Sequence, residues 1–407
     1  MESSVQFLLT LGGILLLGLF TSTIAHRTAL PRVTLLLIFG IIIGHEGFDI
    51  IPLEFSSHFD LIAEITLLMV GFLLGGKLTL DSLKESAGDV FWISICAALV
   101  TASLVSALLI LIGISSDIAI ILGCIASATA PTAILDVVEE AKNKIGFKAQ
   151  QKKFSNTLLS IVAIDDVWAL LLFALGLSIA KTLNGHGADS LFFATAAWEV
   201  FGAIGLGIML GIPSAYLTGR AKPGQPMIIE ALGIVFICGG VAIWLEVSYL
   251  IAAMTLGATI ANLAKHHDYP FHAIEDIETP FMVVFFVLAG ASLDLASFEE
   301  LGLFGALYIT SRALGKYFGS MLGSQISGST LMTKKWMGLA LLPQAGVPIG
   351  MALVAANQFP EHRQILLSVV ISSTILFDII GPILTRYAIG QAGKTTLAVK
   401  TASKDKA

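Results

Sequence analysis

Two adjacent carboxylates, Asp165 and Asp166, lie within an apolar run that covers residues 156–181. The run is longer than the roughly 20 residues that a helix needs to cross a bilayer. A charged carboxylate near the bilayer centre costs on the order of 2.5 to 3.5 kcal/mol on insertion scales, so a pair there indicates a path for an ion or a proton. An alternative is that the helix begins later and the pair lies among lipid headgroups. The mostly apolar residues from Leu158 to Ala163 argue against that alternative.

Two basic residues, Arg312 and Lys316, lie inside another apolar run, ALYITSRALGKYFGSMLGS. They are four residues apart, so on a helix they share one face, which must point into the protein if lipid is to be avoided. One of the two can neutralise one aspartate, and the other aspartate is then left for a proton or a monovalent cation to occupy in turn. The alternative is that the two side chains reach back to a membrane interface.

Two apolar segments carry prolines and hydroxyl or amide side chains near their middle. Within residues 117–140 these are Ser127, Thr129, Pro131 and Thr132, and within residues 336–357 they are Pro343 and Gln344. Proline removes a backbone hydrogen bond, and small polar side chains can satisfy the freed carbonyls or face a cation. Two broken helices in corresponding halves predict a transporter built from inverted repeats, with its site near the membrane midplane. The alternative is that each proline only kinks its helix.

The composition places the whole chain in a membrane. Hydrophobic residues make up 56% of it, charged residues 13%, and the mean hydropathy is +0.88. A soluble enzyme is excluded, because its charged fraction would be near a quarter. The net charge of -6 and the lack of a basic arm predict no nucleic-acid partner. The three cysteines have no ligand spacing, and we expect no cofactor.

The hydropathy pattern predicts an all-α membrane protein with about thirteen transmembrane helices, in two inverted six-helix repeats with discontinuous crossing helices. The repeats are expected at about 1–183 and 225–390, with a linker helix at about 195–218 and a short cytoplasmic tail at 391–407. The transmembrane domain thus covers residues 1–390. The candidate helices are 5–24, 33–44, 60–78, 89–113, 117–140, 156–182, 195–218, 226–246, 249–265, 279–297, 301–325, 336–357 and 364–390.

The distribution of positive charge predicts the orientation. With these helices, nineteen of the 23 Lys and Arg residues fall on one side of the membrane, and only Lys181 and Arg363 fall on the other. Arg312 and Lys316 account for the remaining two. The positive-inside rule therefore places the N-terminus outside and the C-terminus in the cytoplasm. The short chain without eukaryotic targeting signals favours a bacterial inner membrane.

Several motifs together resemble a known family. They are LPRVTLLLIFGIIIGHEGF at 30–48, SATAPTA at 127–133, AIDDVWALLLFAL at 163–175, GKYFGSMLGS at 315–324 and LALLPQAGVPIGMAL at 339–353. The chain resembles the monovalent cation:proton antiporter-2 family over essentially its whole length, specifically the sodium/proton antiporter members. The paired aspartates are the most specific of these motifs. The resemblance implies the sodium/proton antiporter fold and a homodimer.

The resemblance also implies roles for individual residues. Asp166 would be the main ligand of the cation and the proton, and Asp165 would pair with a base on the eleventh helix. Lys316 matches that base best, with Arg312 as second choice. Two aspartates are typical of members that exchange more protons than cations and are therefore electrogenic. The cation would be sodium or lithium, with potassium also open, and its coordination would be completed by Thr129 and Ser127.

Other functions were weighed against this one. An intramembrane aspartyl protease needs two aspartates on separate helices that share a proton. Neighbouring residues on one helix point roughly 100° apart, so Asp165 and Asp166 do not fit that chemistry. A sodium-coupled solute symporter and a potassium/proton efflux antiporter of the same fold stay open, although the chain lacks the large nucleotide-binding domain that glutathione-gated potassium relatives carry after a position equivalent to Gln391.

Overall fold

The computed structural model describes residues 2–27, 32–45, 47–52, 55, 58–79, 88–131, 133–135, 137–138, 141, 149–184, 198–218, 228–264, 268–292, 296–344 and 346–404. These ranges are helical with short connections and contain no strand. The longer helices are α1 (Glu2–Arg27), α2 (Arg32–Ile43), α4 (Phe59–Gly76), α6 (Gly88–Leu111), α7 (Ser116–Ala126), α9 (Ala149–Asn184), α11 (Ala203–Thr218), α12 (Ile228–Trp244), α13 (Tyr249–Leu263), α14 (Asp268–Ala291), α15 (Ala296–Ile326), α16 (Leu331–Ala340), α17 (Gly346–Gln358) and α18 (Arg363–Lys404). Short helical turns, η1 (Trp198–Gly202) and η2 (Pro360–His362), precede α11 and α18.

Many of these helices are apolar along their whole length. Among the described residues, six spans are long and apolar enough to cross a membrane: Val5–Ala25, Phe59–Gly76, Gly88–Leu111, Gln151–Lys181, Trp198–Leu217 and Pro360–Ala392. Shorter apolar helices, α2, α7, α12 and α13, lie between them. Apolar helices of this length have no favourable place in water, so the chain is a multi-pass membrane protein.

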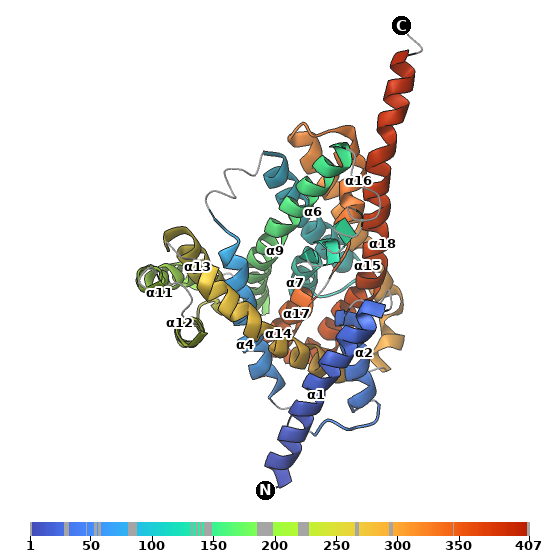
Figure 1. The fold of residues 1–407 in the computed structure, drawn as a ribbon. Coiled ribbons are helices and arrows are strands. Elements are labelled where there is room, and N and C mark those ends of the chain that lie inside the picture. Colours follow the sequence, from blue (N-terminus) through green and yellow to red (C-terminus); the bar gives the residue numbers. More distant parts are fainter. Residues whose placement is uncertain are drawn as a thin grey trace.

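The helices pack as two groups. The first group, which we call the core bundle, consists of α6, α7, α9, α15, α16, α17 and α18. The second group, which we call the panel, consists of α1, α2, α4, α11, α12, α13 and α14. In Figure 1 the panel helices α11, α12 and α13 lie on one side of the molecule, and α16 and α18 lie on the other. The candidate aspartates are on α9, so they belong to the core bundle.

Glycines let two panel helices approach closely. A Cβ atom at Gly40 of α2 would lie 2.2 Å from the carbonyl oxygen of Val287 on α14. In return, a Cβ atom at Gly290 would lie 2.2 Å from the carbonyl oxygen of Leu37. Small residues at such crossings bring backbones together, which is how helices gain packing energy where lipid offers no hydrophobic drive.

The helices extend beyond the apolar segments predicted from hydropathy. α9 begins at Ala149 where the apolar run begins at 156, and α14 begins at Asp268 where a start at 279 is predicted. α18 continues to Lys404, past the predicted beginning of the tail at 391. Hydropathy detects only the part of a helix that lies in lipid, so polar turns that continue the same helix are missed.

Candidate functional site

Two helices are interrupted by non-helical segments, and these two segments are hydrogen-bonded to each other. α7 ends at Ala126 and helical backbone resumes at Pro131, while α16 ends at Ala340 and α17 begins at Gly346. The backbone N–H of Ala130 donates to the carbonyl oxygen of Pro343 at 2.9 Å. The Thr129 hydroxyl donates to the carbonyl oxygen of Leu341 at 3.3 Å. The two segments therefore supply hydrogen-bond partners that neither helix can supply for itself.

Arg312 binds the carbonyl ends of both broken helices. Its Nη1 donates to the Leu342 carbonyl at 2.9 Å, and its Nη2 donates to the Ala128 carbonyl at 2.8 Å. The guanidinium is fully buried and lies 4.3 Å from the centre of the Phe377 ring. Each helix C-terminus carries about half a negative charge, so one cation between two such ends is well placed. The planar guanidinium can reach two acceptors at once.

Lys316 forms a buried ion pair with Asp165. Its Nζ lies 2.7 Å from Asp165 Oδ2, and both side chains are fully buried. Asp165 Oδ1 has no hydrogen-bond partner within the described part of the chain. Two charges taken out of water are tolerable only when they neutralise each other. Of the two bases on α15, Lys316 is therefore the one that is paired with an aspartate.

Asp166 is buried beside this pair and forms no ion pair with any residue that the structure describes. Its exposed fraction is 1%, and its Oδ1 has no hydrogen-bond partner among the described residues. The backbone N–H of Thr129 faces its carboxyl group. Asp165, Lys316 and Lys77 are within electrostatic reach. The carboxyl group is thus available to a proton or a small cation, next to the non-helical backbone of residues 127–130.

The other predicted site residues lie around the interruptions. Ser127 is buried, and its hydroxyl donates to the Cys124 carbonyl at 2.6 Å, so its oxygen lone pairs stay free to accept or to bind a cation. Gln344 is buried, and its Oε1 accepts from the Ser373 hydroxyl at 3.0 Å. Pro131 begins the second half of the first broken helix. Thr132 lies outside the described residues.

Asp378 lies apart from the aspartate pair. It is buried in α18, and its Oδ2 accepts from the Thr34 hydroxyl of α2 at 2.6 Å. This bond connects the core bundle with the panel. Asp378 therefore makes a contact between the two helix groups.

Sequence reasoning missed two contributions to the site. Lys77, at the C-terminal end of α4, is not among the predicted site residues, yet its ammonium group acts on Asp166. For Arg312 the sequence suggests an aspartate partner or a membrane interface, whereas its partners are backbone carbonyls. For Lys77, the only local signal in the sequence is its place directly after a Gly-Gly pair at a helix end. For the carbonyl partners of Arg312 the sequence carries no signal.

The donor set at the site suits a monovalent cation. It consists of carboxylate, hydroxyl and backbone carbonyl oxygens from the two aspartates and from residues 127–130. Within the described ranges, no group of three or more His, Cys, Asp or Glu side chains could hold a metal ion. Oxygen ligands with little net negative charge favour sodium, lithium or potassium over transition metals.

Comparisons with known proteins agree with this arrangement. Over 394 residues the chain is 22% identical to the ammonium/proton antiporter subunit AmhT of Alkalihalophilus pseudofirmus, covering 96% of this chain and 97% of that protein. It is 24% identical over 375 residues to the probable sodium/proton antiporter 2 of Methanocaldococcus jannaschii, covering 86% of this chain and 84% of that protein.

The fold matches that of solved antiporter structures. The sodium proton antiporter MjNhaP1 of M. jannaschii, solved at pH 8, superposes with a TM-score of 0.77 at 19% identity, over 97% of this chain and 99% of that one. An electron-microscopy structure of MjNhaP1 gives a TM-score of 0.73 at 18% identity. The predicted all-helical antiporter fold and the predicted kinship with sodium/proton antiporters are confirmed, whereas the count of thirteen helices and the bounds of the two repeats stay predictions. The family model for the transmembrane sodium/hydrogen exchangers matches residues 13–389, so this chain belongs to the sodium/hydrogen exchanger family.

Proposed function

We propose that this chain is an electrogenic antiporter that exchanges a monovalent cation for protons at Asp166 and Asp165. The observation that carries the proposal is the asymmetry of the two buried aspartates. Asp165 is held by Lys316 at 2.7 Å, whereas no cationic side chain among the described residues lies at hydrogen-bond distance from Asp166. A buried carboxylate without a fixed partner must be neutralised, and a proton and a small cation can each do so. The two then compete for the same group.

The pairing with Lys316 supplies the second proton. A cation that binds both carboxylates withdraws Asp165 from Lys316. The buried ammonium then has no partner and releases a proton. One proton leaves Asp166 and one leaves Lys316 for each cation that binds, so a full cycle moves one net charge. This ratio of two protons to one cation is the reason for proposing electrogenic exchange.

The interruptions complete the cation site in this proposal. The Thr129 backbone N–H faces Asp166, and the hydroxyls of Thr129 and Ser127 with nearby backbone carbonyls would replace part of the cation's hydration shell. Arg312 stays bound to the carbonyls of Ala128 and Leu342, so those two oxygens are held in place. Pro131, Pro343 and Gln344 lie at the two interruptions, and in this proposal they prevent either helix from continuing without a break past the cation site.

Alternating access follows from the two helix groups. The core bundle carries the aspartates and would move against the panel, which exposes the site to each side in turn. We place the N-terminus outside and the C-terminus in the cytoplasm of a bacterial inner membrane, on the strength of the Lys and Arg distribution. The termini lie at opposite ends of the molecule (Figure 1), as an odd number of crossings requires. We propose a homodimer, as the resemblance implies.

Proton movement in everted membrane vesicles tests the proposal. Respiration makes the vesicles acid inside, and a pH dye reports recovery after addition of sodium, lithium, potassium or ammonium chloride. Ammonium is included because the relative AmhT is named for it. We expect a cation-dependent recovery that Asp166→Asn abolishes. The matched control is Asp378→Asn, a buried aspartate away from the site whose replacement can still accept from Thr34, and it should retain activity.

The same assay separates the alternatives. A recovery rate that changes when valinomycin and potassium clamp the membrane potential supports electrogenic exchange, and a rate that ignores the potential supports electroneutral exchange. Recovery with potassium alone would identify potassium/proton efflux. No recovery with any cation, in protein with a normal melting temperature, would rule out antiport and favour the sodium-coupled symporter.

A further inference from the structure

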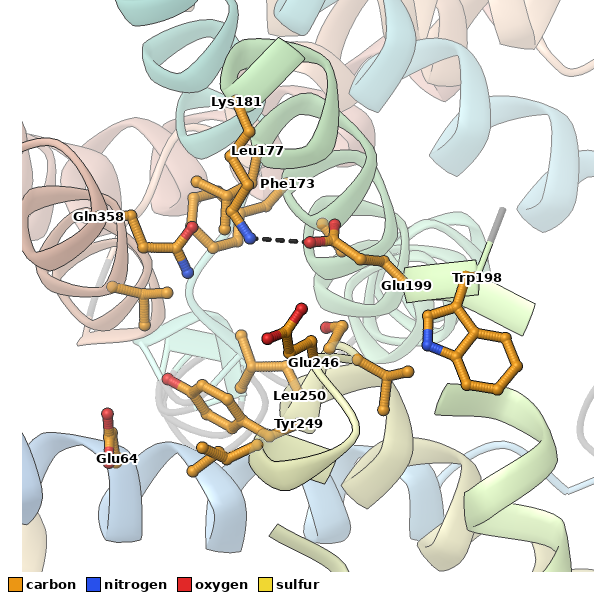
Figure 2. A pocket seen from close by; sticks show the side chains of 15 residues that line it. Glu64, Phe173, Leu177, Lys181, Trp198, Glu199, Glu246, Tyr249, Leu250 and Gln358 are labelled. Atoms are coloured by element: carbon orange, nitrogen blue, oxygen red, sulfur yellow. Dashed lines mark hydrogen bonds and ion pairs between the residues drawn. The ribbon is translucent and has the colours of Figure 1, made fainter. Parts of the chain in front are cut away.

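A cavity of about 520 Å³ opens between the core bundle and the panel, away from the aspartate pair. α9 and α17 line it from the core bundle, while α4, η1, α13 and the turn at residues 246–248 line it from the panel (Figure 2). We call it the Lys181 cavity. In the proposed orientation it lies on the external side, because Lys181 is one of the few basic residues there.

The Lys181 cavity is separate from Asp166. Phe173 lines its wall and is buried, and it follows Asp166 by seven residues on the same helix. Seven residues of α-helix span about 10 Å at 1.5 Å each. Leu250 and Val354, both buried, also lie on this wall. Neither aspartate is among the residues that line the cavity.

The charges in the Lys181 cavity are mostly negative. Glu64, Glu199 and Glu246 line it together with one base, Lys181. Lys181 Nζ lies 2.8 Å from Glu199 Oε1, an ion pair that joins α9 to η1. Among the described residues, Glu64 and Glu246 have no ion pair. Figure 2 shows the Glu246 carboxylate between the ion pair and Tyr249. Two unneutralised carboxylates in one cavity attract cations.

A smaller pocket of about 90 Å³ adjoins this cavity and carries several side-chain oxygens in a partly apolar lining. It shares Glu64, Tyr249, Val354 and Gln358 with the Lys181 cavity and adds Asp60, Ala63, Leu353 and Asn357. Asp60 and Glu64 are four residues apart on α4, so they face the same side and repel each other. The Tyr249 hydroxyl is buried and lacks a hydrogen-bond partner in the described part of the chain. A water molecule needs about 10 to 15 Å³, so the pocket has room for a partly hydrated cation.

Arg363 leaves the pocket open to a cation at Glu64. Its guanidinium binds Asn357 at 2.8 Å and reaches Asp60 at 3.4 Å. Arg363 therefore offsets the negative charge of Asp60, while the negative charge of Glu64 is not offset by an ion pair within the described residues. A hard monovalent cation beside Glu64 would supply the missing positive charge, and the Tyr249 hydroxyl oxygen would act as one of its ligands.

We propose that Glu64, with the Tyr249 hydroxyl and the amide oxygen of Gln358, forms a second binding site for a monovalent cation, on the external side of the aspartate pair. This inference rests on the proposed antiport for its role, which is to hold the cation after it leaves Asp166. The site is built from both helix groups, since Gln358 belongs to the core bundle and Glu64 and Tyr249 belong to the panel. Binding of a cation there depends on how the two groups are arranged.

Binding of radioactive sodium to the purified protein tests the site directly, by scintillation proximity at constant ionic strength with choline chloride. We expect the Asp166→Asn variant to retain saturable sodium binding and the Asp166→Asn/Glu64→Gln double variant to lose it. Glu64→Asp, which keeps the carboxylate, should restore part of the binding. Glu230→Gln removes an exposed carboxylate at the other end of the panel and should change nothing. Complete loss of binding in Asp166→Asn alone, or full retention in the double variant, would overturn the proposal.

Transport from each side tests its role. In right-side-out vesicles, Glu64→Gln should raise the half-saturating sodium concentration roughly fivefold, while in everted vesicles it should leave that concentration unchanged. An equal change on both faces would mean that Glu64 acts on the fold and not on an external site. Wild-type protein that binds sodium at Glu64 but moves no protons would refute antiport and leave the second site standing.

Discussion

Arg312 lies one helical turn before Lys316 on α15, and the two cations bind different kinds of partner. Arg312 donates to backbone carbonyls of both interrupted helices, and Lys316 donates to the Asp165 carboxylate. The charge of Arg312 therefore stabilises the carbonyl ends of the two interrupted helices. The charge of Lys316 is opposed by a group that can also bind a cation, so only this second interaction can be exchanged during transport.

Replacing Lys316 by Met should destabilise the protein by on the order of 3 kcal/mol, because Asp165 would remain buried without its partner. Thermal unfolding in detergent measures this. Asp165→Asn together with Lys316→Met removes both charges, so it should recover most of the loss in melting temperature while cation-dependent proton movement stays absent. A single Lys316→Met variant that melts like the wild type would contradict the buried ion pair.

Replacing Arg312 by Lys should also impair the protein, although the charge is kept. An ammonium group cannot span the carbonyls of Ala128 and Leu342 as the planar guanidinium does, and it loses the contact with the Phe377 ring. We expect a loss of about 2 kcal/mol in stability and slower transport. Phe377→Leu, which removes only the ring, should cost less. Wild-type stability in Arg312→Lys would show that one carbonyl contact is sufficient.

Gly381→Ala should reduce transport and stability, since α18 packs against the second interruption at this point. An added Cβ would lie 2.6 Å from Pro343 Cα and 2.8 Å from its nitrogen, both backbone atoms that cannot turn away. Overpacking of this kind typically costs about 1 to 3 kcal/mol. Gly390→Ala is the matched control on the same helix, because no atom lies within 4 Å of its added Cβ. Equal melting temperatures for the two variants would count against the close contact.

Thr34→Val should weaken the contact between α2 and α18. The substitution keeps the shape of the side chain but removes the hydroxyl that donates to the buried Asp378 carboxylate, which then keeps only the backbone N–H of residue 34, at a cost of about 1 kcal/mol. Because the bond joins the core bundle to the panel, the transport rate should change more than the apparent affinity for the cation. A changed affinity with an unchanged maximal rate would place Asp378 at the cation site instead.

Much of the fold was predictable from the sequence. Apolar length and the two proline-bearing segments predicted an all-helical membrane transporter, the family resemblance implied the antiporter fold, and helices such as α2 and α4 match their predicted segments within a few residues. The ends were harder to predict. α14 begins eleven residues before its predicted start at 279, at Asp268, because polar turns outside the membrane carry no hydropathy signal.

The candidate site was only partly predictable. The aspartate pair and Lys316 could be named, because charge within an apolar run is costly and demands a partner. The different partners of Arg312 and Lys316 could not be predicted. Both are basic residues in the same apolar run, and only the folded structure shows that backbone carbonyls face Arg312 and that Asp165 faces Lys316. Lys77 was missed for the same reason: its effect on Asp166 comes from the packing of α4 beside α9, about 90 residues later in the chain.

The crossing of the two interruptions has a consequence for how the protein is made. The carbonyls of Ala128 and Leu342 share one guanidinium, and Ala130 donates to Pro343, so each half of the chain completes the backbone bonds of the other. We therefore expect that neither half folds alone. While only the first half has been synthesised, its interrupted helix lacks the partners that the second half supplies. Genes split between α11 and α12 should give active protein only when both fragments are synthesised in the same cell.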